Sequence, residues 1–159
     1  MSNNILITGA AGFIGSNFIR YFKKKYPQYN LLALDKMTYA GDMKNLDDIM
    51  EDITFIKGDI CDFDFLLKIL KENSIDGIIN FAAETHVDKS IENPNIFVIT
   101  NVLGTQNLLE AARQIWGEGS NNKFLQISTD EVYGALGEIR NFFWELINKS
   151  QQSIFCIES

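Results

Sequence analysis

Three glycines near the N-terminus have a spacing that could bind a ligand. Gly9, Gly12 and Gly15 follow the apolar segment 5–7 and lead into apolar residues that recur every four positions from Ile14. A glycine-rich turn between a strand and a helix lets backbone N–H groups approach a diphosphate, and the helix N-terminus favours its negative charge. The alternative is a tight turn that binds nothing, and the residues after the second strand bear on that choice.

An acidic residue stands where a dinucleotide-binding fold needs a ribose ligand. Asp35 ends the apolar segment 31–34, twenty residues after Gly15. Its carboxylate would bind the 2′-hydroxyl of NAD and repel the 2′-phosphate of NADP, although the neighbouring Lys36 weakens this preference slightly. Asp59 follows the third apolar segment and either contacts adenine or caps a turn, and the sequence leaves both open. The pattern therefore favours NAD binding.

The remaining segments predict the elements that must position these residues. Strands are expected at 5–7, 31–34, 53–56, 75–81 and 123–128, and helices at 14–26, 63–70 and 94–116, with a shorter one near 45–50. Asp62 is expected to cap the helix that follows it. This alternation predicts an α/β fold, a doubly wound, Rossmann-like parallel sheet with helices on both faces.

The composition excludes several classes of protein. The chain has 159 residues, 46% of them hydrophobic, which is room for one domain. A net charge of -7 argues against a nucleic-acid partner. No apolar stretch approaches the ~18–20 residues that span a bilayer, and signal-peptide features are lacking, so we expect a cytoplasmic protein with no membrane partner. Two cysteines and one histidine are too few for the usual metal sites, and no metal is expected.

Longer motifs resemble a known family. Gly-x-x-Gly-x-x-Gly at 9–15 is similar to the extended short-chain dehydrogenase/reductase superfamily. The segments 35–41 (Asp-Lys-Met-Thr-Tyr-Ala-Gly), 81–90 and 128–134 (Ser-Thr-Asp-Glu-Val-Tyr-Gly) together resemble the dTDP-glucose 4,6-dehydratases. The likeness extends over residues 4–138. The Asp-Glu pair favours a dehydratase over an epimerase, because an epimerase eliminates no water.

The resemblance implies a set of contacts with NAD. The glycine loop and the residues that start the helix would meet the diphosphate, 35–38 the adenosine ribose, 59–60 the adenine, and 81–85 the nicotinamide half. The family's chemistry does not require His86, which we interpret as a packed or solvent-side residue. The implied cofactor-binding residues are Gly9, Gly12, Phe13, Ile14, Gly15, Asp35, Lys36, Met37, Thr38, Asp59, Ile60, Phe81, Ala82, Ala83, Glu84, Thr85 and Thr100.

The resemblance also implies a reaction. Such an enzyme oxidises C4 of dTDP-glucose with NAD, removes the C5 proton, eliminates the C6 hydroxyl as water and returns hydride to C6, which gives dTDP-4-keto-6-deoxyglucose. Glu131 matches the base and Asp130 the acid, and these opposite roles require environments that separate their pKa values. Thr129 matches a hydroxyl that binds the substrate near C4, and Thr85 would also reach the sugar. Without the resemblance, the acidic pair would be interpreted as a solvated turn.

The last residues depart from the family pattern. The superfamily's Tyr-x-x-x-Lys motif is missing, since no tyrosine follows Tyr133. Residues 148–159 can be back-translated so that a shifted frame encodes Pro-Tyr-Ser-Ala-Ser-Lys. We therefore interpret 1–138 as an incomplete NAD-binding domain without the last strands and the substrate domain, and 139–159 as a frameshifted, non-native tail. No turnover is expected from this chain.

This interpretation has consequences for the sheet and for assembly. Strand 123–128 would have an unpaired outer edge, which favours marginal stability and ill-defined association. The resemblance implies a homodimer for the intact protein. Three functions stay open: part of a dTDP-glucose 4,6-dehydratase, part of a related UDP-sugar dehydratase, epimerase or decarboxylase, or a non-catalytic NAD-binding fragment.

Overall fold

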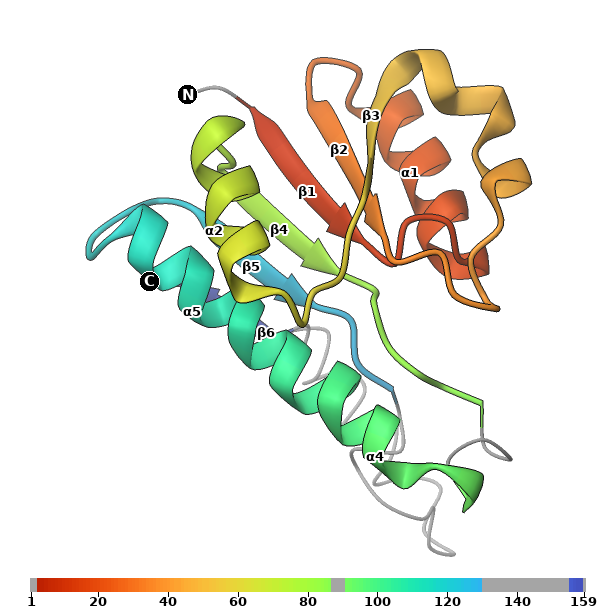
Figure 1. Ribbon diagram of the computed structural model, residues 1–159. Coiled ribbons are helices and arrows are strands. Elements are labelled where there is room, and N and C mark those ends of the chain that lie inside the picture. The colour runs from red at the N-terminus through yellow and green to blue at the C-terminus, as the bar shows by residue number, and fades with distance from the viewer. Residues whose placement is uncertain (1–2, 87–90, 130–154, 159) are drawn as a thin grey trace, which may run out of the picture.

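A sheet with parallel central strands forms the core of the protein (Figure 1). The computed structural model describes residues 3–86, 91–129 and 155–158. The strand order is β3 (Ile53–Lys57), β2 (Asn30–Asp35), β1 (Asn4–Thr8), β4 (Gly77–Asn80), β5 (Lys123–Gln126) and β6 (Phe155–Glu158). The first five strands in this order pair in parallel. The chain winds outward from β1 in one direction to β3 and then in the other direction to β5, so a crevice opens beyond the carboxyl ends of β1 and β4.

Helices cover both faces of this sheet (Figure 1). One face carries α1 (Phe13–Lys25) and the 3₁₀ helices η1 (Met43–Asn45) and η2 (Asp47–Asp52). The other face carries α2 (Phe63–Glu72) and α5 (Thr105–Trp116). Successive residues of β1 pack on opposite faces of the sheet. Leu6 packs with Leu66 and Leu108 on one face, and Ile7 packs with Ile19 on the other. Burial on both faces explains the nearly continuous apolar strands, and the predicted doubly wound fold is confirmed.

Local sequence signals account for the helix boundaries. The Asp62 carboxylate accepts a hydrogen bond from the Phe65 N–H at 3.0 Å and caps α2, as predicted. Pro94 opens a helix that runs through α4 (Pro94–Phe97), η3 (Val98–Gly104) and α5. The predicted helix 94–116 is therefore confirmed, but η3 is a π-helix. Gly104 lies at its end, where a β-carbon would come within 2.6 Å of the Ile60 side chain.

The outer edge of β5 differs from the prediction. Strand β6 pairs with β5 in antiparallel register, with Leu125 opposite Cys156 and Phe124 opposite Ile157. The expectation of an unpaired edge at this strand is therefore wrong. An open edge exposes backbone N–H and C=O groups, so an available apolar segment with high strand propensity lowers the free energy by pairing with it.

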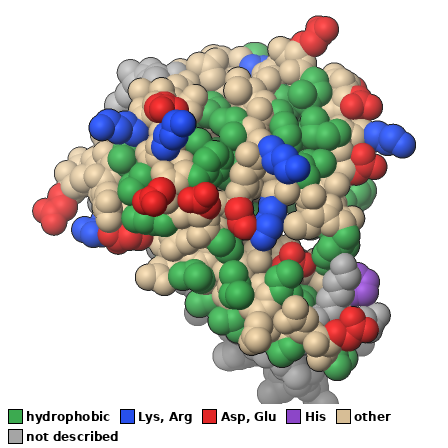
Figure 2. All heavy atoms as spheres, in the orientation of Figure 1, with side chains coloured by type: hydrophobic (Ala, Val, Ile, Leu, Met, Phe, Trp, Pro, Cys, Tyr) green, Lys and Arg blue, Asp and Glu red, His purple; other side chains and the backbone are tan. Residues whose placement is uncertain are grey.

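An exposed apolar strip follows the start of the long helix. Figure 2 shows apolar side chains over the lower part of the molecule, where α4 lies in Figure 1. The exposed large side chains on and just before α4 and η3 are Ile91, Val98, Ile99, Val102 and Leu103. Within the described ranges, no helix is long and apolar enough to cross a membrane.

Candidate functional site

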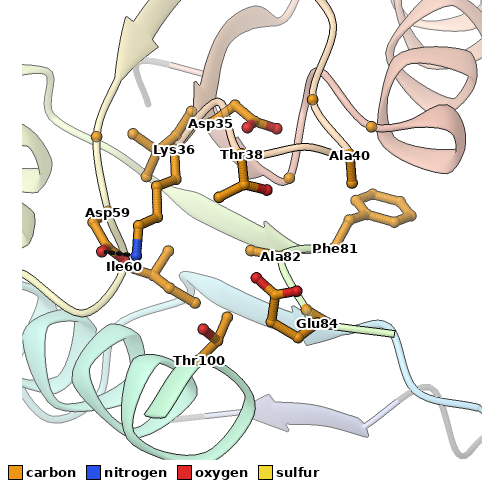
Figure 3. Close-up of a pocket in the computed structure, with 16 residues that line it drawn as sticks. Asp35, Lys36, Thr38, Ala40, Asp59, Ile60, Phe81, Ala82, Glu84 and Thr100 are labelled. Carbon is orange, nitrogen blue, oxygen red and sulfur yellow. Dashed lines mark ion pairs between the residues drawn. The ribbon is translucent and has the colours of Figure 1, made fainter. Parts of the chain in front are cut away.

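A pocket lies at the carboxyl ends of the central strands (Figure 3). Its walls come from the turn after β1, the segment that follows β2, the turn after β3, the segment that follows β4, and η3. The lining residues are Gly9, Gly12, Leu34, Asp35, Lys36, Thr38, Ala40, Gly41, Gly58, Asp59, Ile60, Phe81, Ala82, Ala83, Glu84 and Thr100. Five segments distant in sequence therefore meet at the crevice where open α/β sheets bind their ligands.

The glycine loop makes close approaches that no other residue permits. Gly9 has φ +64°, and a β-carbon there would lie 2.7 Å from the Ala82 nitrogen. A β-carbon at Gly15 would lie 2.2 Å from the Gly9 oxygen. The Gly12 N–H donates to the Gly9 carbonyl at 3.2 Å and closes the turn. The loop thus presents the N-terminus of α1, whose first N–H groups have no partner within the helix, to the pocket.

The Asp35 carboxylate lies at the end of β2 and is only 8% exposed. Its Oδ2 accepts from the Ala11 N–H at 2.9 Å, and its Oδ1 accepts from the Met37 N–H at 2.7 Å. Met37 reaches this contact with φ +59°, in the left-handed region. A carboxylate offers about four acceptor sites, so two backbone donors leave capacity for ligand hydroxyls.

A salt bridge links two walls of the pocket. Lys36 Nζ lies 2.6 Å from Asp59 Oδ2, and Figure 3 shows the lysine crossing toward the turn after β3. Asp59 Oδ1 also accepts from the Cys61 N–H at 2.9 Å. Burial raises the pKa of Asp59, but the hydrogen bonds from Lys36 and the Cys61 N–H lower it by more, so this pKa lies below its usual value. The hydrogen bond to Asp59 raises the pKa of Lys36. Asp59 therefore closes a turn and lines the pocket at once.

A buried amide and an exposed amide fix the wall that follows β4. Asn80 is fully buried, and its Oδ1 accepts from the Ala82 N–H at 3.2 Å and from the Thr8 hydroxyl. Asn101 pairs with both backbone groups of Glu84, accepting from its N–H at 2.8 Å and donating to its carbonyl at 2.9 Å. The sequence prediction missed both amides. Only Asn80 gave a signal, as a polar residue that ends an apolar strand.

The second contact of Glu84 reaches across the pocket. The Tyr39 hydroxyl lies 3.2 Å from Glu84 Oε2, so the segment after β2 is joined to the segment after β4. His86 is exposed, and its ring centroid lies 6.3 Å from that of Tyr39 in an edge-on arrangement. Of the two alternatives left open for His86, a packed or a solvent-side residue, its exposure agrees with the second.

The structure brings together most of the residues that the sequence singled out. Twelve of the seventeen implied cofactor residues line the pocket: Gly9, Gly12, Asp35, Lys36, Thr38, Asp59, Ile60, Phe81, Ala82, Ala83, Glu84 and Thr100. Leu34, Ala40, Gly41 and Gly58 also line it and were not predicted.

The other predicted site residues lie outside the lining. Gly15 is buried beneath the loop, whereas Phe13 and Ile14 begin α1 with 80% and 65% of their surfaces exposed. Met37 meets Asp35 through its backbone. Thr85 and Thr129 are exposed beyond the ends of β4 and β5. Asp130 and Glu131 lie outside the described residues, so their roles stay predictions.

A comparison with known protein families identifies the family of this chain. The sequence profile of the family described as GDP-mannose 4,6 dehydratase matches residues 6–145. The chain belongs to this family. The match to GDP-mannose 4,6 dehydratase includes every residue that lines the pocket, and the family resemblance inferred from the motifs is confirmed.

Individual relatives agree with this assignment. A dTDP-glucose 4,6-dehydratase of Xanthomonas campestris pv. campestris (strain B100) is 44% identical over an alignment of 144 residues that covers 86% of this chain and 40% of the relative. The chain thus spans about two fifths of the length of the curated dehydratases it matches.

Solved structures match the fold as well. A dTDP-glucose 4,6-dehydratase of Streptomyces venezuelae with NAD and TYD bound has a TM-score of 0.75 and 41% identity, over 84% of this chain and 42% of that one. A Bacillus anthracis dTDP-glucose 4,6-dehydratase in complex with NAD has a TM-score of 0.72 and 40% identity, over 85% of this chain and 40% of that one.

Proposed function

We propose that this chain is the NAD-binding part of a nucleotide-sugar 4,6-dehydratase that converts dTDP-glucose to dTDP-4-keto-6-deoxyglucose. The identity to dTDP-glucose 4,6-dehydratases and the NAD bound in two of the matched structures support this proposal. The role would be in deoxysugar biosynthesis. We also propose a cytoplasmic location and a homodimer for the whole protein, in line with the resemblance.

The residues of the pocket fit a dinucleotide. The main support for this proposal is the position of Asp35, whose buried carboxylate faces the pocket beside the glycine loop. A diphosphate would lie against the loop, where a side chain at Gly9 or Gly15 would clash. The ribose hydroxyls would donate to Asp35, and adenine would lie against Ile60 near Asp59. A 2′-phosphate would meet the Asp35 charge, which favours NAD over NADP.

Catalysis would take place at the far end of this pocket. NAD, when bound, would supply hydride transfer. Thr129 would hold the sugar near C4, Glu131 would remove the C5 proton, and Asp130 would protonate the leaving C6 hydroxyl. Thr85 would contact the sugar from the segment after β4. Oxidation at C4 also requires an acceptor for the hydroxyl proton, and the resemblance gives that role to the Tyr-x-x-x-Lys motif, which this sequence lacks.

Titration of the chain with NAD and with NADP tests the proposal. We expect NAD to bind more tightly, and Asp35→Asn to reduce the ratio of the two affinities by roughly tenfold, or about 1.4 kcal/mol, because the variant removes the negative charge that repels a 2′-phosphate. Isothermal titration calorimetry measures both affinities. Equal binding of NAD and NADP by the unmodified chain would refute the role of Asp35.

A remote carboxylate serves as the control. Asp62→Ala removes the acceptor that caps α2, away from the pocket. This variant should lose stability through the cap while it keeps the NAD to NADP ratio of the unmodified chain. If both variants changed the ratio of NAD to NADP affinity to a similar extent, the cause would be a general loss of stability and not the Asp35 charge.

A further inference from the structure

Both backbone polar groups of Ala11, in the glycine loop, are hydrogen-bonded to groups between Asp35 and Asn45. Ala11 is fully buried, and its N–H donates to Asp35 Oδ2 at 2.9 Å. Its carbonyl accepts two hydrogen bonds, from the Asp42 N–H at 3.2 Å and from Asn45 Nδ2 at 2.9 Å. Asp35, at the end of β2, therefore fixes the Ala11 N–H, and the segment between β2 and β3 fixes the Ala11 carbonyl.

Asn45 is itself fixed to α1. Arg20, on α1, donates from Nη2 to the Asn45 carbonyl and forms a salt bridge of 2.7 Å with Asp48. The Asp42 carboxylate accepts from the Lys44 N–H at 3.0 Å and caps η1. The segment 42–48 thus runs beside α1 and contacts it both before its first turn and near its middle. The amide of Asn45 is in this way held against the loop.

The direction of the Ala11 carbonyl matters for a bound anion. This carbonyl belongs to the peptide that leads into Gly12, directly before the N-terminus of α1. A carbonyl oxygen carries partial negative charge and would repel a phosphate, whereas the N–H groups of the first turn attract it. Ala11 and the two residues that donate to its carbonyl, Asp42 and Asn45, do not line the pocket, so these hydrogen bonds keep the oxygen out of the lining.

We propose that Asn45 is a positioning residue for the diphosphate of the bound dinucleotide and that it acts through the Ala11 carbonyl. The inference rests on the proposed NAD binding but adds a residue that the pattern of glycines does not contain. Asn45→Asp is the sharpest variant, because it keeps the shape of the side chain, replaces the N–H donor with an acceptor and leaves the backbone contact with Arg20.

Two ligands distinguish an effect on diphosphate binding from an effect on nucleoside binding. ADP-ribose contains the diphosphate, whereas adenosine contacts only the ribose and adenine region. We expect Asn45→Asp to weaken ADP-ribose binding about tenfold and to change adenosine binding less than twofold. Calorimetry measures the first affinity, and ligand-observed NMR measures the second.

Amide hydrogen exchange in the ligand-free chain supplies a test that needs no cofactor. The Gly12 N–H bonds to Gly9 and the Ser16 N–H bonds to Gly12, so both amides report on the loop. We expect both to exchange at least tenfold faster in Asn45→Asp. The matched control is Asn73→Asp, which makes the same exchange at an amide that donates to the Ile69 carbonyl at 2.8 Å at the end of α2. Its loop exchange and ligand affinities should stay unchanged.

The outcomes are distinct. If the unmodified chain binds ADP-ribose and Asn45→Asp binds it equally well, the inference is overturned and the proposed function stands. Weaker ADP-ribose binding without faster loop exchange also overturns it, because the effect would not pass through Ala11. If the unmodified chain binds neither NAD nor ADP-ribose, the proposed function fails and the inference fails with it.

Discussion

The backbone of Gly41 lies so close to the Asp35 carboxylate that a β-carbon at position 41 would come within 2.9 Å of Asp35 Oδ1. This oxygen cannot move aside easily, because the carboxylate already holds the N–H groups of Ala11 and Met37. The Gly41 N–H also bonds to the Thr38 carbonyl at 3.2 Å, which fixes the turn that brings it there. The segment after β2 thus closes over Asp35 only because residue 41 has no side chain.

Gly41→Ala should therefore disturb the ribose side of the pocket. We expect a loss of about 1 kcal/mol in the free energy of unfolding, since overpacking costs roughly 1–3 kcal/mol, and a clear loss of NAD affinity. Urea unfolding and calorimetry measure the two effects. A double-mutant cycle with Asp35→Ala provides the control, because the alanine at 41 should cost much less once the carboxylate is gone. Additive effects would contradict this contact.

Gly9 and Gly119 form a matched pair for testing the contact between the loop and Ala82. Both have left-handed φ, +64° and +77°, but a β-carbon at Gly119 would meet nothing within 4 Å. Gly119→Ala should cost only about 1–2 kcal/mol, the ordinary penalty of a left-handed residue. Gly9→Ala should cost at least about 1 kcal/mol more, because its β-carbon collides with the backbone of Phe81 and Ala82, directly after β4. Urea denaturation compares them, and equal losses would contradict the approach to Ala82.

The salt bridge between Lys36 and Asp59 should make stability depend on pH in a defined way. The lowered pKa of Asp59 means that its stabilisation is present above the unfolded value, about 3.9, and is lost as the pH falls below it. The raised pKa of Lys36 means that its stabilisation is present below about 10.4 and is lost at higher pH. Lys36→Met should thus cost about 0.5 kcal/mol between about pH 5 and 9 and almost nothing near pH 3.

Urea unfolding at several pH values measures this difference. Lys68→Met, at an exposed position of α2, is the control for the loss of a positive charge. A constant difference between Lys36→Met and the unmodified chain across the whole pH range would show that packing, rather than the ion pair, explains the effect.

Strand β6 should protect the outer edge of β5. Removal of residues 155–159 takes away the four paired positions of this strand and exposes the backbone of Lys123–Gln126. We expect the shortened chain to associate more strongly, because an unpaired edge is a template for another chain. Light scattering after size exclusion measures the mass, and removal of Ser159 alone is the control. Identical masses for both shortened chains would show that β6 has no such role.

Local patterns were sufficient for the elements and for much of the site. The glycine spacing after the first strand, Asp35 at the end of the second and Asp62 before α2 each predicted a feature that the structure contains. The physical reason is that strand alternation, helix capping and glycine turns depend on residues a few positions apart. The same reasoning predicted the parallel sheet, whereas the family resemblance supplied the set of cofactor residues, twelve of which line one pocket.

Tertiary packing decided the contacts between distant segments. Gly41 against Asp35, Asn45 with Ala11 and Asn101 with Glu84 join residues whose types are ordinary in polar loops and exposed helix positions. The close approach of Gly41 and the hydrogen bonds of Asn45 and Asn101 form only after the sheet and helices bring the segments within about 3 Å. The pairing of β6 with β5 is of the same kind. A sequence shows that a strand edge needs a partner, but the folded chain determines which segment supplies it.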